Sequence, residues 1–266
     1  MDAIRKRGEF RDLTKLGPTL AQGPIRYDNN MLANLAWKSC QIEHNSLSVG
    51  ISEQIEKRLP NVSSPDLEDI MDVKLPCASD LVSATGARPD QRLELVELRN
   101  HLFALKATLH TAYLNQEPST DNLLHDVKIL SQILLRDTPH HHSVMYRKTT
   151  IQTKSDLYAV FPYPLEIEAN MERWAKWTLN SSEADSVHPL IRAVWMTLYF
   201  MSVHPFPDGN GRLSRVLQAV YMARNGLVPV MCTPDLDRAG YIRMVVSARD
   251  GRPQEWCEEI VRATCQ

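Results

Sequence analysis

The chain has 266 residues, a length that suits one large domain or two small ones around a buried core. Apolar residues make up 43%, as in ordinary globular proteins, and the net charge is -2. This balance excludes a global basic field that would hold nucleic acid, so a bound anion requires a local arrangement of residues.

Export and membrane insertion are not expected. The charged start, Met1 to Arg7, has no apolar run behind it, unlike a secretory signal peptide. The longest apolar stretch, 193–203, is too short to span a bilayer. The 5 cysteines are odd in number and include no Cys-x-x-Cys, which argues against a disulfide framework or a zinc site. The sequence predicts a cytoplasmic or nuclear protein.

The N-terminal part of the chain predicts one helix and then a loop. Apolar residues in 28–45 recur at the spacing of one helical face. Residues 60–90 contain repeated prolines and turn formers, so we interpret them as a long loop that includes one short helix at 66–73.

Two strong helices and a hairpin follow. Pro89 opens a helix with a regular apolar stripe, and Ser119 precedes another as a capping residue. The segment 146–161 is different, because β-forming residues flank a possible turn at 154–156. It predicts a short exposed β-hairpin.

Helical patterns resume in the last hundred residues. Gly226 follows Asn225 as a helix-ending signal. We expect an all-α fold, a single helical domain with one exposed hairpin. Its remaining helices are predicted at about 164–180, 188–203, 211–225, 234–249 and 253–264.

The stretch from His204 to Arg215 reads His-Pro-Phe-Pro-Asp-Gly-Asn-Gly-Arg-Leu-Ser-Arg and lies between two predicted helices. Gly209 and Gly211 allow the backbone to turn its amides towards a ligand. The helix that begins there presents free N–H groups and a positive dipole end, which favour phosphate. The stretch therefore predicts an anion site.

Side chains of the same stretch supply further chemistry. Arg212 and Arg215 lie one helical turn apart, so both can face one side. Asn210 can donate to a phosphate oxygen, and Asp208 can hold Mg²⁺ together with phosphate oxygens. His204, at the other side of the turn, titrates near neutral pH and can take a proton from a hydroxyl.

These residues resemble the Fic family motif, His-Pro-Phe-x-Asp-Gly-Asn-Gly-Arg-x-x-Arg, at every fixed position. His188 to Ile191, Arg147 and the helix with Glu97 and Asn100 are also similar to parts of that family. The resemblance covers roughly 30–260. It implies a Fic-type helical bundle with a β-hairpin flap, in four parts: an N-terminal extension (1–27), an inhibitory helix (28–48), an inserted loop (60–90) and a core (91–266) with its flap at 146–162.

The resemblance also implies an activity, transfer of AMP from ATP to a Ser, Thr or Tyr hydroxyl of another protein. His204 would be the general base, Asp208 would hold Mg²⁺ or Mn²⁺, and Asn210 would contact the α-phosphate. Phe206 would anchor the loop in the core. The remaining nucleotide contacts would come from Gly209, Gly211, Arg212 and Arg215.

Two further regions take their expected roles from the resemblance alone. The flap, with Thr149, Thr150 and Ile151, would dock the target by strand addition. Tyr241 would help to form the adenine pocket. The family often has an asparagine seven residues further on, where this chain has Ala248.

An upstream segment, Ser39 to Asn45, resembles the family's inhibitory motif, Ser/Thr-x-x-x-Glu-Gly/Asn, with His44 in place of the Gly or Asn. Glu43 would pair with Arg215 and occupy the group that binds the γ-phosphate. ATP would then sit in a non-productive pose.

Two other functions remain open from the sequence. One is a hydrolase that removes AMP from the same target, with Glu43 aligning water. The other is a non-catalytic protein-binding module, which the intact motif argues against. The expected partners are ATP and a protein with a hydroxyl acceptor, without nucleic acid or membrane. Many members of the family form homodimers.

Overall fold

The computed structural model describes residues 30–62, 64, 66–111, 119–141, 145–153, 159–180 and 187–265. These residues form helices and contain no β-strand, which confirms the all-α prediction. The expected N-terminal extension, 1–27, lies outside them.

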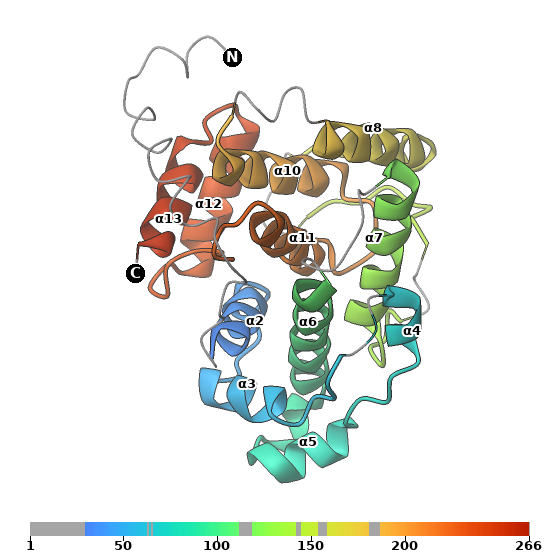
Figure 1. Ribbon diagram of the computed structural model, residues 1–266, viewed down its shortest axis with the longest axis vertical. Coiled ribbons are helices and arrows are strands. Elements are labelled where there is room, and N and C mark those ends of the chain that lie inside the picture. Colours follow the sequence, from blue (N-terminus) through green and yellow to red (C-terminus); the bar gives the residue numbers. More distant parts are fainter. Residues whose placement is uncertain are drawn as a thin grey trace.

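Helix α11 (Asn210–Arg224) lies in the middle of the molecule (Figure 1). Around it pack α10 (Pro189–Val203), α6 (Arg92–Thr111), α7 (Thr120–Leu135) and α2 (Met31–Ile42). Apolar residues such as Leu213, Val216 and Met222 are buried along α11. A helix that is buried on most of its faces is a core element, and in α11 the burial extends to its first residue, Asn210.

The remaining helices cover this centre. Helix α8 (Ile167–Leu179) packs on α10 and α7, and Trp174 of α8 donates a hydrogen bond from Nε1 to the carbonyl of Met196 at 3.1 Å. Helices α12 (Arg238–Arg249) and α13 (Gln254–Thr264) pack on the other side of α10.

The region between α2 and α6 contains more helix than the sequence suggested. Helix α4 (Leu67–Met71) agrees with the short helix expected at 66–73. The loop prediction for 60–90 was otherwise wrong, because α5 (Ala78–Thr85) lies within it and packs on α6. The prolines at 76 and 89 flank α5 rather than interrupt it, and Gly86 ends it with φ +69°.

Two other boundaries differ from the prediction. The helix expected over 28–45 ends at Ile42, and α3 (Val49–Glu56) follows it. Ser48 starts α3, since its side chain accepts a hydrogen bond from the amide of Ile51. A 3₁₀ turn, Pro89–Gln91, precedes α6, where the sequence placed Pro89 in the helix itself.

The hairpin prediction falls partly outside the described residues, since its turn and part of its return strand belong to 154–158. Of the described residues in 146–162, Thr153 makes a β-bridge and the others are irregular. The hairpin therefore stays a prediction.

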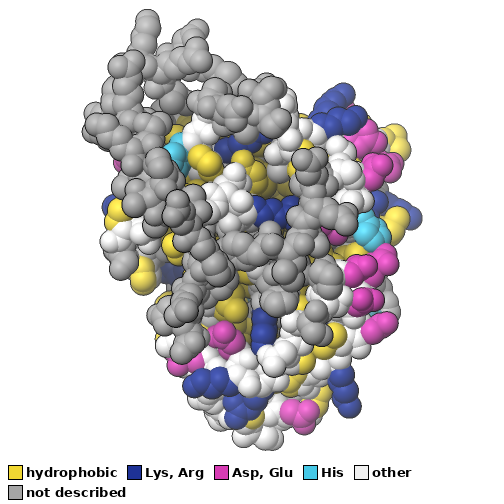
Figure 2. Space-filling view, in the orientation of Figure 1, with side chains coloured by type: hydrophobic (Ala, Val, Ile, Leu, Met, Phe, Trp, Pro, Cys, Tyr) yellow, Lys and Arg dark blue, Asp and Glu magenta, His cyan; other side chains and the backbone are white. Residues whose placement is uncertain are grey.

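Acidic and basic side chains are interspersed along the edge of the face shown in Figure 2. No helix in the described part of the chain combines the length and the apolar character that crossing a bilayer requires.

The turn that ends α2 is built on an unusual backbone conformation. His44 has φ +69°, in the left-handed region, which a residue with a Cβ adopts at a cost. Asn45 secures the turn, because its Nδ2 donates to the carbonyl of Glu94 at 2.9 Å and its Oδ1 accepts from the amide of Leu47 at 3.1 Å. The orientation of the last turn of α2 thus depends on His44 and Asn45.

We expect His44→Val to lower the free energy of unfolding by about 1–2 kcal/mol, because a β-branched residue tolerates the left-handed region poorly. His44→Asn is the matched control and should leave stability nearly unchanged, since asparagine enters this region more readily. Urea denaturation of both variants measures the effect. Equal stability of the two variants would show that the turn has no such requirement.

Candidate active site

The loop between α10 and α11 has two left-handed residues. His204 ends α10 with φ +49°, and Gly209 precedes α11 with φ +76°. Phe206 is fully buried and its ring lies 5.4 Å from that of Tyr146, so the loop is anchored in the core as expected. The turn brings His204 and the first residues of α11 to the same place.

Asn210 braces this loop from within. Its Oδ1 accepts from the amide of Phe206 at 2.9 Å, and its Nδ2 donates to the carbonyl of Phe206 at 2.7 Å. These two bonds hold the loop in shape. The amide nitrogen carries a second N–H, and Asn210 also lines the cavity at this loop, so its expected contact with a phosphate stays a prediction.

His204 is held as a neutral imidazole. Burial, with a smaller contribution from the nearby cations Arg249 and Arg147, lowers its pKa to about 4. Its Nδ1 lies 3.3 Å from the carbonyl of Met201, which can only accept, so Nδ1 carries the proton. Nε2 is then the unprotonated nitrogen. This is the tautomer that a general base requires.

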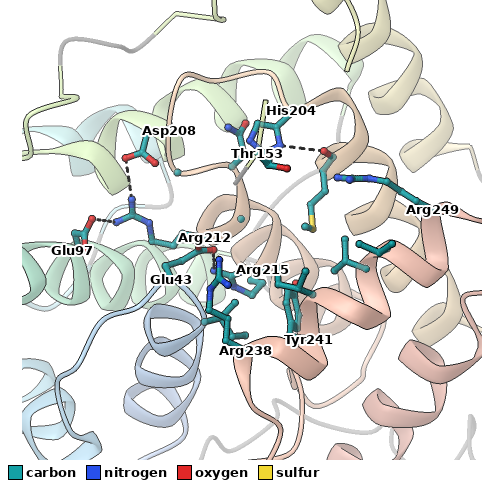
Figure 3. Close-up of a pocket in the computed structure, with 18 of the residues that line it drawn as sticks. Glu43, Glu97, Thr153, His204, Asp208, Arg212, Arg215, Arg238, Tyr241 and Arg249 are labelled. Carbon is teal, nitrogen blue, oxygen red and sulfur yellow. Dashed lines mark hydrogen bonds and ion pairs between the residues drawn. The ribbon is translucent and has the colours of Figure 1, made fainter. Parts of the chain in front are cut away.

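The loop opens into a cavity of about 410 Å³ (Figure 3). His204, Asp208 and the start of α11 line one part of it, and α12 lines another. The sequence-predicted residues that meet there are Glu43, His204, Asp208, Gly209, Asn210, Gly211, Arg212, Arg215 and Tyr241.

Arg215 is buried, and α2 supplies its partners. Its Nε donates to Oγ of Ser39 at 2.7 Å, and its Nη2 donates to the carbonyl of Ser39 at 3.1 Å and to Oε1 of Glu43 at 2.6 Å. The guanidinium also lies over the ring of Tyr241, 5.6 Å from the ring centre. The expected pairing of Glu43 with Arg215 is therefore present in the structure (Figure 3).

Glu43 also occupies the start of α11. A Cβ added to Gly211 would collide with Oε1 of Glu43, which places that carboxylate directly against the helix N-terminus. Burial alone would raise the pKa of Glu43, but Arg215, together with Arg212 and Arg238, outweighs it and the pKa is lowered. An anionic oxygen thus already lies where a helix N-terminus and a guanidinium attract phosphate.

Arg212 is held by two other carboxylates. Its Nη1 lies 3.0 Å from Oε1 of Glu97 on α6, and its Nη2 lies 3.3 Å from Oδ2 of Asp208. Asp208 therefore has a partner inside the protein, which the sequence did not suggest. Burial raises the pKa of Glu97, and Arg212 opposes this. Both arginines of the motif are paired with protein carboxylates in this state.

Asp208 is the motif's one carboxylate, and its side chain is 39% exposed. Among the described residues, no group of three or more His, Cys, Asp or Glu side chains is placed to hold a metal ion. Mg²⁺ often binds through one or two carboxylates together with phosphate oxygens and water. Asp208 fits that pattern, because it lines the same cavity as the start of α11.

The sequence did not point to two basic residues of the cavity. Arg238 and Arg249 lie on α12 and line it together with Tyr241 and Val245. Their spacing, 238, 241, 245 and 249, is that of one helical face and was the available signal. Thr149 and Thr150 are exposed and Ile151 is partly buried, and from this segment it is Thr153 that lines the cavity.

Comparison with known proteins agrees with this geometry. The sequence model of the Fic/DOC family matches residues 121–222, which include the loop between α10 and α11. The chain is a Fic family protein. "Protein adenylyltransferase Fic" of Drosophila persimilis is 36% identical over 90 residues, which are 34% of this chain and 17% of that relative. The protein of the same name in Drosophila sechellia is 34% identical over 90 residues. The chain thus matches less than a fifth of the length of these relatives.

Solved structures share the fold over nearly the whole chain. A Fic domain-containing signalling protein of Bacteroides thetaiotaomicron has a TM-score of 0.65 at 16% identity, covering 96% of this chain and 89% of its own. Fic-1 of Caenorhabditis elegans has a TM-score of 0.62 at 19% identity, covering 96% and 68%. At these identities the likeness concerns the Fic fold.

The burial of His204 leads to a titration that can be measured. Its imidazole should titrate near pH 4, well below the ordinary value of about 6.5. The unfolded chain then takes up this proton first, so the contribution to stability is present above about pH 6.5 and is lost as the pH falls towards 4. NMR titration of labelled histidine, with His204→Gln to assign the signal, tests this. Titration near pH 6.5 would contradict it.

Proposed function

We propose that this Fic protein transfers AMP from ATP to a Ser, Thr or Tyr hydroxyl of a protein. One observation carries the proposal. A neutral imidazole, a helix N-terminus and two arginines one turn apart line a single cavity. That combination suits attack of a hydroxyl on a phosphate ester.

His204 would act on the incoming hydroxyl. Its Nε2 would accept the proton as the hydroxyl oxygen forms a bond to the α-phosphorus. The bond to the leaving oxygen breaks, and pyrophosphate departs with its electron pair. The hydrogen bond from Nδ1 to the carbonyl of Met201 stabilises the imidazolium that forms.

The triphosphate would lie at the start of α11. Backbone amides from Gly209 to Gly211, Arg212 and Arg215 would offset its charge. Asp208 would hold Mg²⁺ or Mn²⁺ beside them, and the metal would neutralise negative charge on the phosphates when bound. On α12, Tyr241 and the apolar residues Ile242 and Val245 would line the space for the adenine ring.

Glu43 would inhibit this reaction by competing with phosphate. Its carboxylate binds Arg215 and contacts the start of α11. A γ-phosphate could therefore not bind at these two places while Glu43 occupies them. ATP bound beside Glu43 would have to place its phosphates elsewhere, away from in-line attack.

The position of Glu43 also supports a second candidate, removal of AMP from a modified target. Its carboxylate lines the same cavity as His204 and can orient water there. The two activities depend on Glu43 in opposite ways, and one variant therefore separates them.

Glu43→Gly should raise AMP transfer from labelled ATP to proteins of a cell extract, and to the chain itself, by about tenfold or more, because geometry at the reacting centre improves. The same change should impair any AMP removal. Gln41→Gly is the matched control, since it places glycine at an exposed position of the same helix and keeps the carboxylate. Equal transfer by wild type and Glu43→Gly would refute inhibition by Glu43.

His204→Ala in the Glu43→Gly background should lower AMP transfer by about 10²–10⁴-fold, the usual effect of removing a general base. ATP binding, followed by calorimetry, should be largely kept, since the phosphate site lies on α11. Transfer at the parent rate would exclude His204 as the base. His125→Ala, an exposed histidine of α7 that pairs with Glu68, is the control.

A further inference from the structure

Arg147 is a buried arginine outside the motif, and it contacts the motif directly. Its Nε donates to the carbonyl of His204 at 2.8 Å, and its own backbone amide donates to the carbonyl of Pro205 at 2.8 Å. The side chain is almost fully inaccessible, with 2% of the residue exposed. One side of its guanidinium thus binds the backbone of His204, the proposed general base.

The other side of the guanidinium holds the segment 149–162. Nη1 donates to the carbonyl of Thr149 at 2.9 Å, and Nη2 donates to the carbonyl of Pro162 at 2.7 Å. These two carbonyls stand at the two ends of the expected flap. Because the guanidinium is planar and rigid, it fixes the ends of that segment relative to each other and to His204.

The backbone of His204 needs such support. Its φ of +49° lies in the left-handed region, which costs a residue with a Cβ roughly 1–2 kcal/mol. A conformation of this kind persists where neighbouring contacts determine it. The hydrogen bonds from Arg147 to the carbonyls of His204 and Pro205 are contacts of this kind.

A second contact joins the same segment to the imidazole itself. The ring of Phe161, next to Pro162, lies 4.9 Å from the ring of His204 at an angle of 59°. The guanidinium of Arg249 lies 5.2 Å from the centre of the Phe161 ring. The end of segment 149–162 therefore touches both the backbone and the side chain of residue 204, through Arg147 and Phe161.

We propose that Arg147 is a positioning residue that couples the backbone at Thr149 and Pro162 to the base, so that a target bound beside these residues meets His204 in a fixed geometry. The inference rests on the proposed AMP transfer. Arg147 acts through His204 and does not touch ATP, because the residues that line the cavity do not include it. Its loss should therefore change the rate of transfer and spare the affinity for ATP.

Lysine cannot replace Arg147 in this role. It keeps the positive charge but supplies one point donor group instead of a planar fork. Arg192 gives a matched control, since it is equally buried and its Nη2 also donates to two backbone carbonyls, those of Trp177 and Asn180. These carbonyls belong to the end of α8, outside the cavity lining.

The experiment compares Arg147→Lys and Arg192→Lys, each in the Glu43→Gly background. Incorporation of labelled AMP into the protein is followed against ATP concentration, at a temperature where melting curves show every variant folded. We expect Arg147→Lys to lower the maximal rate by about tenfold or more, with the KM for ATP within about threefold of the parent. Arg192→Lys should lower the melting temperature and keep the parent rate.

Phe161→Leu is the second variant, and it tests the coupling to His204 if Arg147→Lys does not fold. It removes the ring contact with His204 at a partly exposed position, and it should also lower the maximal rate without raising the KM for ATP. A maximal rate in Arg147→Lys equal to that of the parent would overturn the inference. If Arg147→Lys does not fold, a maximal rate in Phe161→Leu equal to that of the parent would overturn it. So would an equal loss of rate in Arg192→Lys. Failure of the Glu43→Gly parent to transfer AMP at all would instead refute the proposed function.

Discussion

A positive charge buried at the centre of the molecule constrains much of the structure. The side chain of Arg215 is 1% exposed, and an arginine cannot shed its proton. The protein must therefore surround it with acceptors and an anion. Ser39 of α2 and Glu43, directly after that helix, supply them. Helix α2 is distant in sequence but packs against α11. The position of α2 and the charge of the cavity are two results of the same requirement.

The same reasoning applies to the neighbouring arginine. Arg212 is 4% exposed and lies between Glu97 and Asp208, which come from α6 and from the loop before α11. Both arginines of the motif thus have carboxylate partners from the protein itself, and a bound phosphate would exchange one set of anions for another. This exchange avoids leaving a buried guanidinium without a partner, which would be costly.

The sequence predicted best that the residues from His204 to Arg215 would meet at one place, because they are close together in the chain. Residues three positions apart, such as Gly209 and Arg212, meet within one turn, and their roles depend little on the rest of the chain. Glu43 was found through a second short motif. Arg147 contacts His204 from a separate segment of the chain, and this contact depends on packing that no local pattern encodes. The helical spacing of Arg249 could have placed it on one face of its helix, but its contact with Phe161 also depends on packing.

The errors in the fold have the same origin. Helix α5 was taken for loop because prolines flank it, yet burial of Leu81 against the core supports a helix there. The helix expected over 28–45 ends at Ile42, and the backbone of His44 then enters the left-handed region. In both cases the surroundings of a segment decide its structure, whereas its residue types left several structures open.

The pairing of Glu43 with Arg215 joins residues 172 positions apart in the chain. A ribosome makes the N-terminal partner first, and domains fold in that direction during synthesis. The residues of α2 therefore leave the ribosome before those of α11. Arg215 is therefore made after its anionic partner, and the guanidinium has a carboxylate available as soon as α11 packs against α2.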